Sequence, residues 1–288
     1  MSEYISSHRI GDATVTVISD GVLPWALEMQ VPESEWRRAM PEADADGKVL
    51  LGINAAHIQL GDASILIDPG FDDPNAEKHE PQGLEWPGLV RSPGLHAALA
   101  QMGVEPEAIT HVLITHAHGD HFAGVTVVRD GVRVPRYPNA RLYIERADWE
   151  ADPATLHAET SAAVQTHLGT LDRHGLLETF DGEREIVPGV TMIAAPGESA
   201  GHSIVRLKSN GQTFYYLGDL FHHRCEFEHL DWAPPDRDVA ALVAARGRLT
   251  TDAVREEAVL VFTHEMFPAW GRVVQTPTGF GWERLDMR

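Results

Sequence analysis

The chain has 288 residues, 43% of them hydrophobic, and a formal charge of −20 at pH 7. This length suits one large domain, 1–288, with a substantial core, and the negative charge argues against nucleic acid as a partner because it repels phosphate backbones. No apolar run is long enough to span a bilayer, and the first residues carry no secretory pattern. The only cysteine, Cys225, rules out an internal disulfide. We therefore expect a cytoplasmic protein without membrane contact.

The hydrophobic pattern predicts strands in both halves of the chain, with helices between and after them. Apolar and β-branched runs bounded by turn residues predict strands at 9–20, 53–60, 64–67, 112–115, 141–144, 190–195, 203–208, 213–217, 258–263 and 272–285. Helical spacing of apolar residues predicts helices at 94–102, 153–174, 236–246 and 251–257. The segments 21–50 and 71–92 look like long irregular loops, which in a compact domain are usually functional or mobile. Two packed sheets covered by helices are the natural arrangement for this pattern.

The densest chemical signal lies directly after the predicted strand 112–115. His116, His118, Asp120 and His121 fall within six residues, with Gly119 among them. A loop that follows a strand can direct several successive side chains into one cavity, and glycine permits the unusual backbone angles that this requires. Imidazole and carboxylate groups are the ligands expected for zinc and similar divalent metals. The segment therefore predicts a metal site.

Further ligands are expected at the ends of other strands. Three candidates follow or end an apolar strand next to glycine or a turn: His202 after strand 190–195, Asp219 after 213–217 and His264 after 258–263. Taken alone, each of them fits a surface or capping role equally well.

With these residues in place, the sequence resembles the metallo-β-lactamase superfamily. The motif His-x-His-x-Asp-His is complete at 116–121, and His202, Asp219 and His264 match the order of the later ligands. The Asp68-Pro69-Gly70 turn is similar to the Asp-x-Gly turn upstream of the family motif. The resemblance spans at least 53–264 and implies an α/β fold, a four-layer αββα sandwich with the active site along one edge of the two sheets.

The resemblance also implies how the ligands are shared between two divalent ions. Its seven ligands would be distributed as follows: His116, His118 and His202 on one ion, Asp120, His121 and His264 on the other, and Asp219 bridging both. Zinc is the expected metal, and manganese, iron and cobalt suit the same ligands.

Members of the superfamily catalyse several reactions, so the fold alone does not define the substrate. Asp219 argues against antibiotic hydrolysis, because true β-lactamases of the superfamily generally lack the bridging aspartate. Two groups of the superfamily remain: lactonases that resemble N-acyl-homoserine lactonases, and phosphotriesterase-like members that resemble methyl parathion hydrolase. We expect hydrolysis of a small neutral ester, with a lactone as the leading substrate and a phosphotriester or aryl ester as the alternative. A non-catalytic metal-binding or sensing protein is the third hypothesis, and a homodimer remains open.

The expected mechanism uses a hydroxide that bridges the two metals, with Asp120 moving a proton to the leaving alkoxide. His222 and His223 lie three and four residues after Asp219, so either could contact substrate or stabilise the oxyanion. The best-known homoserine lactonases have tyrosine where this chain has His222, so a tyrosine-assisted mechanism is not expected. We also expect the loops 21–50 and 71–92 to cover an apolar pocket walled by Phe122, Met266 and Phe267.

Overall fold

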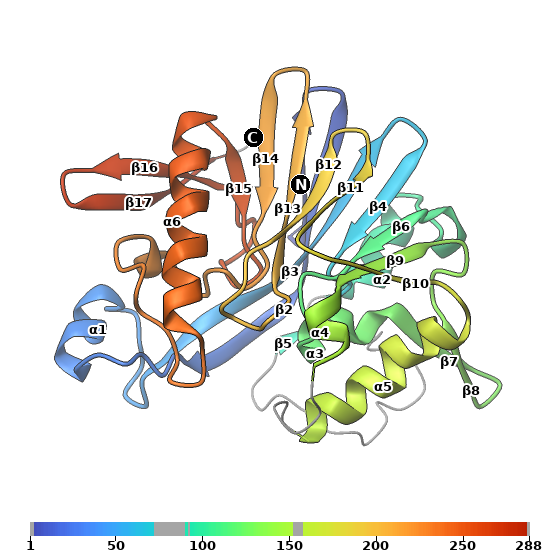
Figure 1. The fold of residues 1–288 in the computed structure, drawn as a ribbon, viewed down its shortest axis with the longest axis horizontal. Coiled ribbons are helices and arrows are strands. Elements are labelled where there is room, and N and C mark those ends of the chain that lie inside the picture. Colours follow the sequence, from blue (N-terminus) through green and yellow to red (C-terminus); the bar gives the residue numbers. More distant parts are fainter. Residues whose placement is uncertain (1–2, 72–89, 92, 152–157, 287–288) are drawn as a thin grey trace.

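Two β-sheets form the centre of the fold (Figure 1). The computed structural model describes residues 3–71, 90–91, 93–151 and 158–286. The first sheet contains β1 (Ile5–Ile10), β2 (Ala13–Ala26), β3 (Lys48–Leu60), β4 (Ala63–Ile67), β6 (His111–Leu113), β9 (Arg141–Glu145) and β10 (Leu177–Phe180) in that order, with β5 (Val90–Arg91) beside β2. The second sheet contains β11 (Glu183–Val187), β12 (Val190–Ala194), β13 (Ser203–Ser209), β14 (Gln212–Tyr216), β15 (Val259–Val261), β16 (Gly271–Thr276) and β17 (Gly279–Arg284) in that order.

Helices cover the outer face of each sheet. The α-helices are α1 (Glu33–Ala39), α2 (Gly94–Gln101), α3 (Gly119–Phe122), α4 (Arg146–Trp149), α5 (Ala158–Arg173) and α6 (Val239–Arg255). The short elements are the 3-10 turns η1 (Pro106–Ala108), η2 (Ala123–Val125) and η3 (Arg224–Phe227) and the hairpin β7 (Thr126–Arg129) and β8 (Val132–Pro135). None of the helices in the described ranges is long and apolar enough to cross a membrane.

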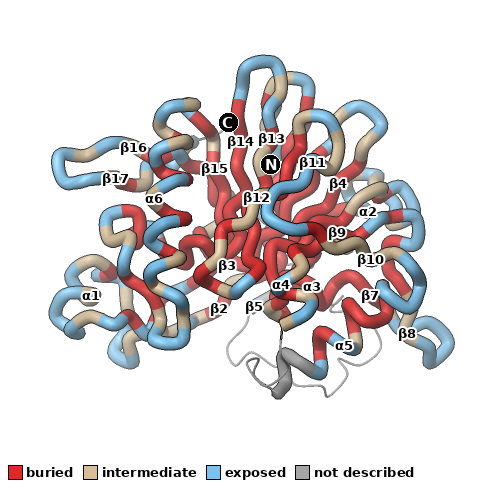
Figure 2. The backbone as a smooth tube through the Cα atoms, in the orientation of Figure 1, coloured by how far each residue is buried: buried red, intermediate tan, exposed pale blue. Residues whose placement is uncertain are grey.

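Three hydrophobic clusters hold these layers together. Between the sheets, Val15 and Ile67 of the first sheet share a buried cluster with Val205 and Phe214 of the second. A second cluster joins α2 and α5 to the outer face of the first sheet, and a third joins α6 to the second sheet. Figure 2 accordingly shows buried backbone through the centres of both sheets and exposed hairpin tips. This confirms the αββα arrangement expected from the sequence.

The predicted strand 9–20 is a hairpin in the structure. β1 ends at Ile10, and Gly11 has a φ of +56° in the turn before β2. Glycine adopts that conformation without strain, so it reverses the chain within a segment rich in β-branched residues. β1 and β2 then pair antiparallel from Ile5 opposite Ile18 to Ile10 opposite Ala13.

The segment 21–50 is more regular than the expected loop. β2 continues to Ala26 because it pairs with β3, which begins at Lys48, and α1 lies between them. This pairing joins residues far apart in the sequence, so the local pattern of prolines and acidic residues conceals it. Of the second expected loop, residues 72–89 and 92 lie outside the described residues, while 90–91 form β5.

Near the C-terminus, one helix replaces the two expected at 236–246 and 251–257. Asp238 caps α6 by accepting a hydrogen bond from the Ala241 amide, and the helix runs unbroken through Gly247 to Arg255. Its buried residues recur at helical spacing: Leu242, Ala245, Arg246, Leu249, Thr250 and Ala253. Packing of this face against the second sheet outweighs the weak helix propensities of glycine and threonine. The expected helix 153–174 corresponds to α5, and residues 152–157 lie outside the described part of the chain.

Candidate metal centre

The site begins where β6 leaves the first sheet. β6 ends at Leu113, and the following loop leads into α3, which starts at Gly119. His116, Asp120 and His121 are buried. The side chain of His118 is 30% exposed, so this residue marks the side of the cluster that solvent can reach.

The second sheet supplies Asp219 and His264. β14 and β15 are parallel neighbours, and these residues follow their last residues, Tyr216 and Val261. Because the carboxyl ends of parallel neighbours open at the same edge of a sheet, the two side chains meet there. His264 Nε2 lies 3.1 Å from Asp219 Oδ2.

One group of potential ligands combines Asp120, His121 and His264. Asp120 Oδ2 lies 3.6 Å from His121 Nε2 and 3.7 Å from His264 Nε2. His121 Nε2 is also 3.3 Å from Asp219 Oδ1. Two ligand atoms bound tetrahedrally to zinc at about 2.1 Å lie roughly 3.4 Å apart. The observed spacings therefore suit a shared cation better than direct hydrogen bonds.

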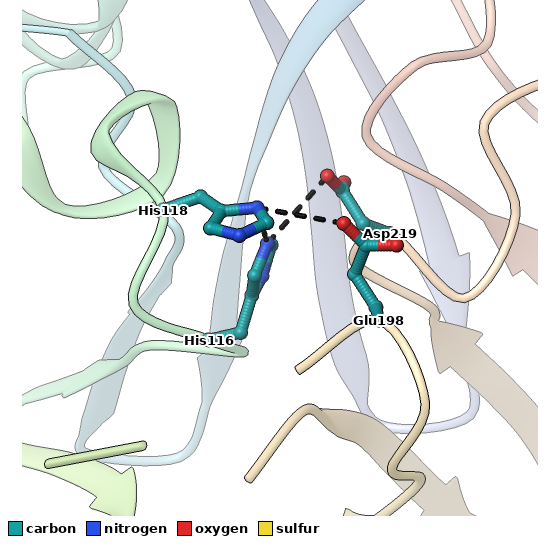
Figure 3. Close-up of side chains that lie close together, drawn as sticks. All are labelled: His116, His118, Glu198 and Asp219. Atoms are coloured by element: carbon teal, nitrogen blue, oxygen red, sulfur yellow. Dashed lines mark hydrogen bonds and ion pairs between the residues drawn. The ribbon is translucent and has the colours of Figure 1, made fainter. Parts of the chain in front are cut away.

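A second group combines His116, His118, Glu198 and Asp219 (Figure 3). His116 Nε2 lies 3.6 Å from Asp219 Oδ2, and His118 Nδ1 lies 3.5 Å from Glu198 Oε1. The two histidine nitrogens, His116 Nε2 and His118 Nδ1, are 2.8 Å apart. Asp219 thus faces both groups, as a bridging ligand would. Glu198 was not predicted as a ligand from the sequence. The only sequence feature that could have indicated it is its position in the loop after β12, where a ligand was expected.

His202 lies beside these groups but outside both of them. It is fully buried, and its ring centre is 5.1 Å from that of His116. Its Nε2 accepts a hydrogen bond from the Asp219 amide at 3.1 Å, and its Nδ1 lies 3.1 Å from the Ala195 carbonyl oxygen. Both ring nitrogens of this expected ligand therefore have partners in the protein.

The two histidines after Asp219 have different surroundings. The His222 ring stacks on His264 with centres 5.3 Å apart, and its Nε2 is 3.5 Å from Asp219 Oδ2, so it belongs to the cluster. His223 points to Glu42, whose Oε1 lies 3.1 Å from His223 Nε2, while His223 Nδ1 accepts a hydrogen bond from the Cys225 amide. His223 therefore binds the segment that follows α1 through Glu42, and it lies outside the metal-ligand groups.

The three residues expected to form an apolar pocket wall also have different surroundings. Phe122 is fully buried within the cluster that joins α5 to the first sheet, so it belongs to the core. Met266 and Phe267 are half-buried and follow His264 directly. Phe267 packs against the cluster between the sheets, so Met266 is the one of the three expected residues that remains a candidate for lining the approach to the centre.

Burial and neighbouring charges divide the histidines into two kinds. Burial lowers the pKa of His116, with help from the charges of His121 and His118, and burial also lowers the pKa of His202. Burial opposes protonation of His121 as well, but Asp219, Asp120 and Asp68 outweigh it and raise its pKa well above the usual value. Burial also opposes protonation of His264 and His222, but neighbouring carboxylates outweigh it. Asp219 raises the pKa of His264, and Glu198 and Asp219 together raise the pKa of His222 to about 9.

The donor set fits divalent metal ions. Among the described residues, His121 Nε2 and Asp219 Oδ1 are buried polar atoms without a hydrogen-bond partner, although they lie 3.3 Å apart. Leaving such atoms unsatisfied in a dry interior is costly. Imidazole nitrogens and carboxylate oxygens facing one another in this way are the ligands of zinc, manganese and iron.

Asp68 supports the loop that carries the first ligands, a role that was not predicted from the sequence. Asp68, which follows β4, accepts hydrogen bonds from the Thr115 amide and hydroxyl, and its Oδ2 lies 2.8 Å from His121 Nδ1. A carboxylate behind a metal-binding histidine fixes the orientation of the ring.

Asp148 joins the ligand loops of the two sheets. Its carboxylate accepts hydrogen bonds from the Ala117 amide in the first loop and from the Gly201 amide and Ser199 hydroxyl in the second. These partners lie 31 to 53 residues away in the sequence, so no local motif indicates them.

Replacing Asp68 with asparagine should weaken metal binding by about 10- to 100-fold, the range typical of such supporting residues. Asparagine tolerates the positive φ of +47° at this position, so the turn should survive. Zinc affinity is measured by competition with a chromophoric chelator. Asp62→Asn, at an exposed hairpin position, is the matched control, and equal affinities for the two variants would contradict the role of Asp68.

Comparison with known proteins agrees with this geometry. The family model described as the metallo-beta-lactamase superfamily matches residues 49–264, and the chain belongs to this superfamily. The N-acyl homoserine lactonase AiiA of Bacillus thuringiensis subsp. kurstaki is 23% identical over 221 residues, which cover 73% of this chain and 79% of the relative. A probable metallo-hydrolase of Mycobacterium tuberculosis is 22% identical over 189 residues, covering 58% of this chain and 56% of that protein.

Two solved structures share the fold over nearly the whole chain. AbOPH, a hydrolase in the beta lactamase superfamily, has a TM-score of 0.82 at 21% identity and covers 100% of this chain and 99% of its own. AidC, a dizinc quorum-quenching lactonase solved with a homoserine product, has a TM-score of 0.82 at 20% identity, covering 99% and 98%.

Proposed function

We propose that this protein is a dinuclear metal-dependent hydrolase of small neutral esters, with N-acyl homoserine lactones or similar lactones as substrates and zinc as the metal. The observation that carries the proposal is the placement of Asp219 between two groups of potential ligands, with spacings near those of a shared tetrahedral ion. The relatives named as lactonases supply the substrate class.

When bound, the two ions would supply a nucleophile at neutral pH and polarise the ester carbonyl. The protein's own groups hold and move the protons. The carboxylate of Asp120 accepts the proton of the attacking water and passes it to the leaving alkoxide. His222 Nε2, between Asp219 and Glu198, donates a hydrogen bond to the oxyanion of the tetrahedral intermediate.

The charge around the centre supports a neutral substrate. Asp120, Glu198 and Asp219 contribute three carboxylates to the cluster, and the chain as a whole carries −20. Two divalent ions would offset the local charge but not the surrounding field. A lactone brings no charge into this site, whereas a phosphate diester or polyanion would be repelled.

The direct test is metal analysis of the purified protein followed by a substrate panel on the two-ion form. We expect the highest kcat/KM for N-acyl homoserine lactones, with lower values for a phosphotriester, an aryl ester and a β-lactam. A higher value for the phosphotriester would overturn the substrate assignment. Two bound ions without turnover of any ester would instead favour a sensing or metal-binding protein.

Metal affinity should rise with pH across the neutral range. The carboxylates raise the pKa values of His121 and His264, so the metal-free protein holds protons on nitrogens that the ions need. Binding must release these protons, and protons compete more strongly as the pH falls. Calorimetric zinc titrations at pH 6, 7 and 8 in two buffers of different ionisation enthalpy measure both the affinity and the protons released. An affinity independent of pH would contradict this assignment of protons.

A further inference from the structure

Glu198 is a buried carboxylate at the edge of the metal centre. It lies in the loop between β12 and β13, and its side chain is 1% exposed. Arg237 Nε contacts Oε2 at 2.7 Å, which provides the charge partner that a buried carboxylate requires. Neither oxygen of Glu198 has a hydrogen-bond partner within the described part of the chain, but Oε2 forms the ion pair with Arg237, whereas Oε1 faces His118 and His222. One oxygen is therefore anchored, and the other is free to bind a ligand.

The free oxygen points into the centre (Figure 3). Glu198 Oε1 lies 3.5 Å from His118 Nδ1 and 3.7 Å from His222 Nε2. These distances are too long for hydrogen bonds. The 3.5 Å separation matches the edge of roughly 3.4 Å that separates two ligands of one tetrahedral zinc ion.

The resemblance to the superfamily assigns this ligand position to His202 instead. In this structure His202 Nε2 uses its lone pair to accept the Asp219 amide hydrogen. A neutral imidazole has one such lone pair, so the same nitrogen cannot also bind a metal. His202 therefore orients the backbone at Asp219, and the position beside His116 and His118 is open to another donor.

We propose, building on the dinuclear centre proposed above, that Glu198 Oε1 ligates the ion held by His116 and His118, in place of His202. Arg237 positions the carboxylate through Oε2. The centre would then contain three carboxylates, Asp120, Glu198 and Asp219. Carboxylate oxygens suit manganese better than imidazole does, so the exchange of ligand also widens the range of metals that the site accepts.

The decisive measurement is a crystal structure of the zinc-loaded protein, with anomalous diffraction at the zinc edge to locate the ions. We expect Glu198 Oε1 at about 2.0–2.2 Å from one ion and His202 Nε2 still on the Asp219 amide. A zinc–His202 bond with Glu198 beyond contact distance would overturn the proposal. Absence of any zinc between the two ligand groups would overturn the dinuclear centre itself, so the two failures are distinguishable.

Solution variants test the same assignment independently of activity. In the cobalt-substituted protein, Glu198→Gln should change the visible ligand-field spectrum and weaken binding of one ion by at least about 10-fold. Glu256→Gln, whose side chain contacts Lys208 and Tyr215 far from the centre, should change neither. His202→Gln should leave the cobalt spectrum close to that of the parent protein. A changed spectrum for His202→Gln and an unchanged one for Glu198→Gln would reverse the assignment, and circular dichroism confirms that each variant is folded.

Discussion

Asp219→Asn is expected to release one of the two ions and to lower kcat/KM by about 10³-fold or more. Asparagine has nearly the same shape but offers one neutral oxygen, so it cannot bridge two cations. Losing the chemistry of one ion costs several kcal/mol of transition-state stabilisation, and each 1.36 kcal/mol corresponds to a factor of ten in rate. The ion count is measured by mass spectrometry of the elements, and the rate is measured on the lactone panel.

A matched control for Asp219→Asn is Asp181→Asn. Asp181 pairs with Arg146 on the surface and is 74% exposed, so its loss should change stability by less than about 0.5 kcal/mol and leave metal content intact. Full loading with two ions and unchanged turnover in the Asp219 variant would remove the bridging role on which the proposed function depends.

Arg246→Met is expected to lower the free energy of unfolding by about 3–5 kcal/mol, the range for removing one partner of a buried ion pair. Arg246 and Glu226 are both buried, with Arg246 Nη2 2.8 Å from Glu226 Oε2. Arg246 also donates hydrogen bonds to three backbone carbonyls: Leu220, Leu230 and Trp232. Methionine would leave all of these acceptors unsatisfied, together with a buried carboxylate. Urea unfolding followed by circular dichroism measures the change.

Arg248→Met provides the control for this prediction, because Arg248 is exposed on the same helix and its loss should change stability by less than about 0.5 kcal/mol. The double variant Glu226→Leu and Arg246→Met removes both charges and should regain part of the loss. Equal stabilities of the Arg246 and Arg248 variants would show that the buried pair contributes nothing.

The Arg246–Glu226 pair also bears on the metal centre. Glu226 Oε2 accepts a hydrogen bond from the His222 amide, so the pair fixes the loop that carries His222 beside His264. Displacement of this loop would move a proton donor of the proposed reaction. The Arg246 variant should therefore lose activity even at temperatures where it remains folded.

The sequence predicted the parts of the site that follow from local pattern. A strand that ends in closely spaced histidines and an aspartate predicts a ligand loop, and strand ends followed by Asp219 and His264 predict further ligands at the same edge. The layers of the fold were predicted as well, because alternating strand and helix patterns with apolar faces allow few arrangements.

Contacts between distant segments could not be predicted in this way. Glu198 becomes a candidate ligand only because its loop lies against His118 and because Arg237, from the loop before α6, neutralises it. The extension of β2 to Ala26 depends on pairing with β3 and not on its own residues. The hydrogen bond from the Asp219 amide to His202 is set by the packing of two loops, which no spacing in the sequence encodes.

The division of the candidate ligands between the two sheets has a consequence for synthesis on the ribosome. The first sheet is complete when β10 ends at Phe180, and the second begins with β11 at Glu183. At roughly 5–20 residues per second, several seconds pass between emergence of the first sheet and of His264. During that time the His116–His121 loop has no partners from the second sheet, and the inner apolar face of the first sheet is uncovered. Protection of this uncovered face, for example by a chaperone, should therefore raise the yield of folded protein.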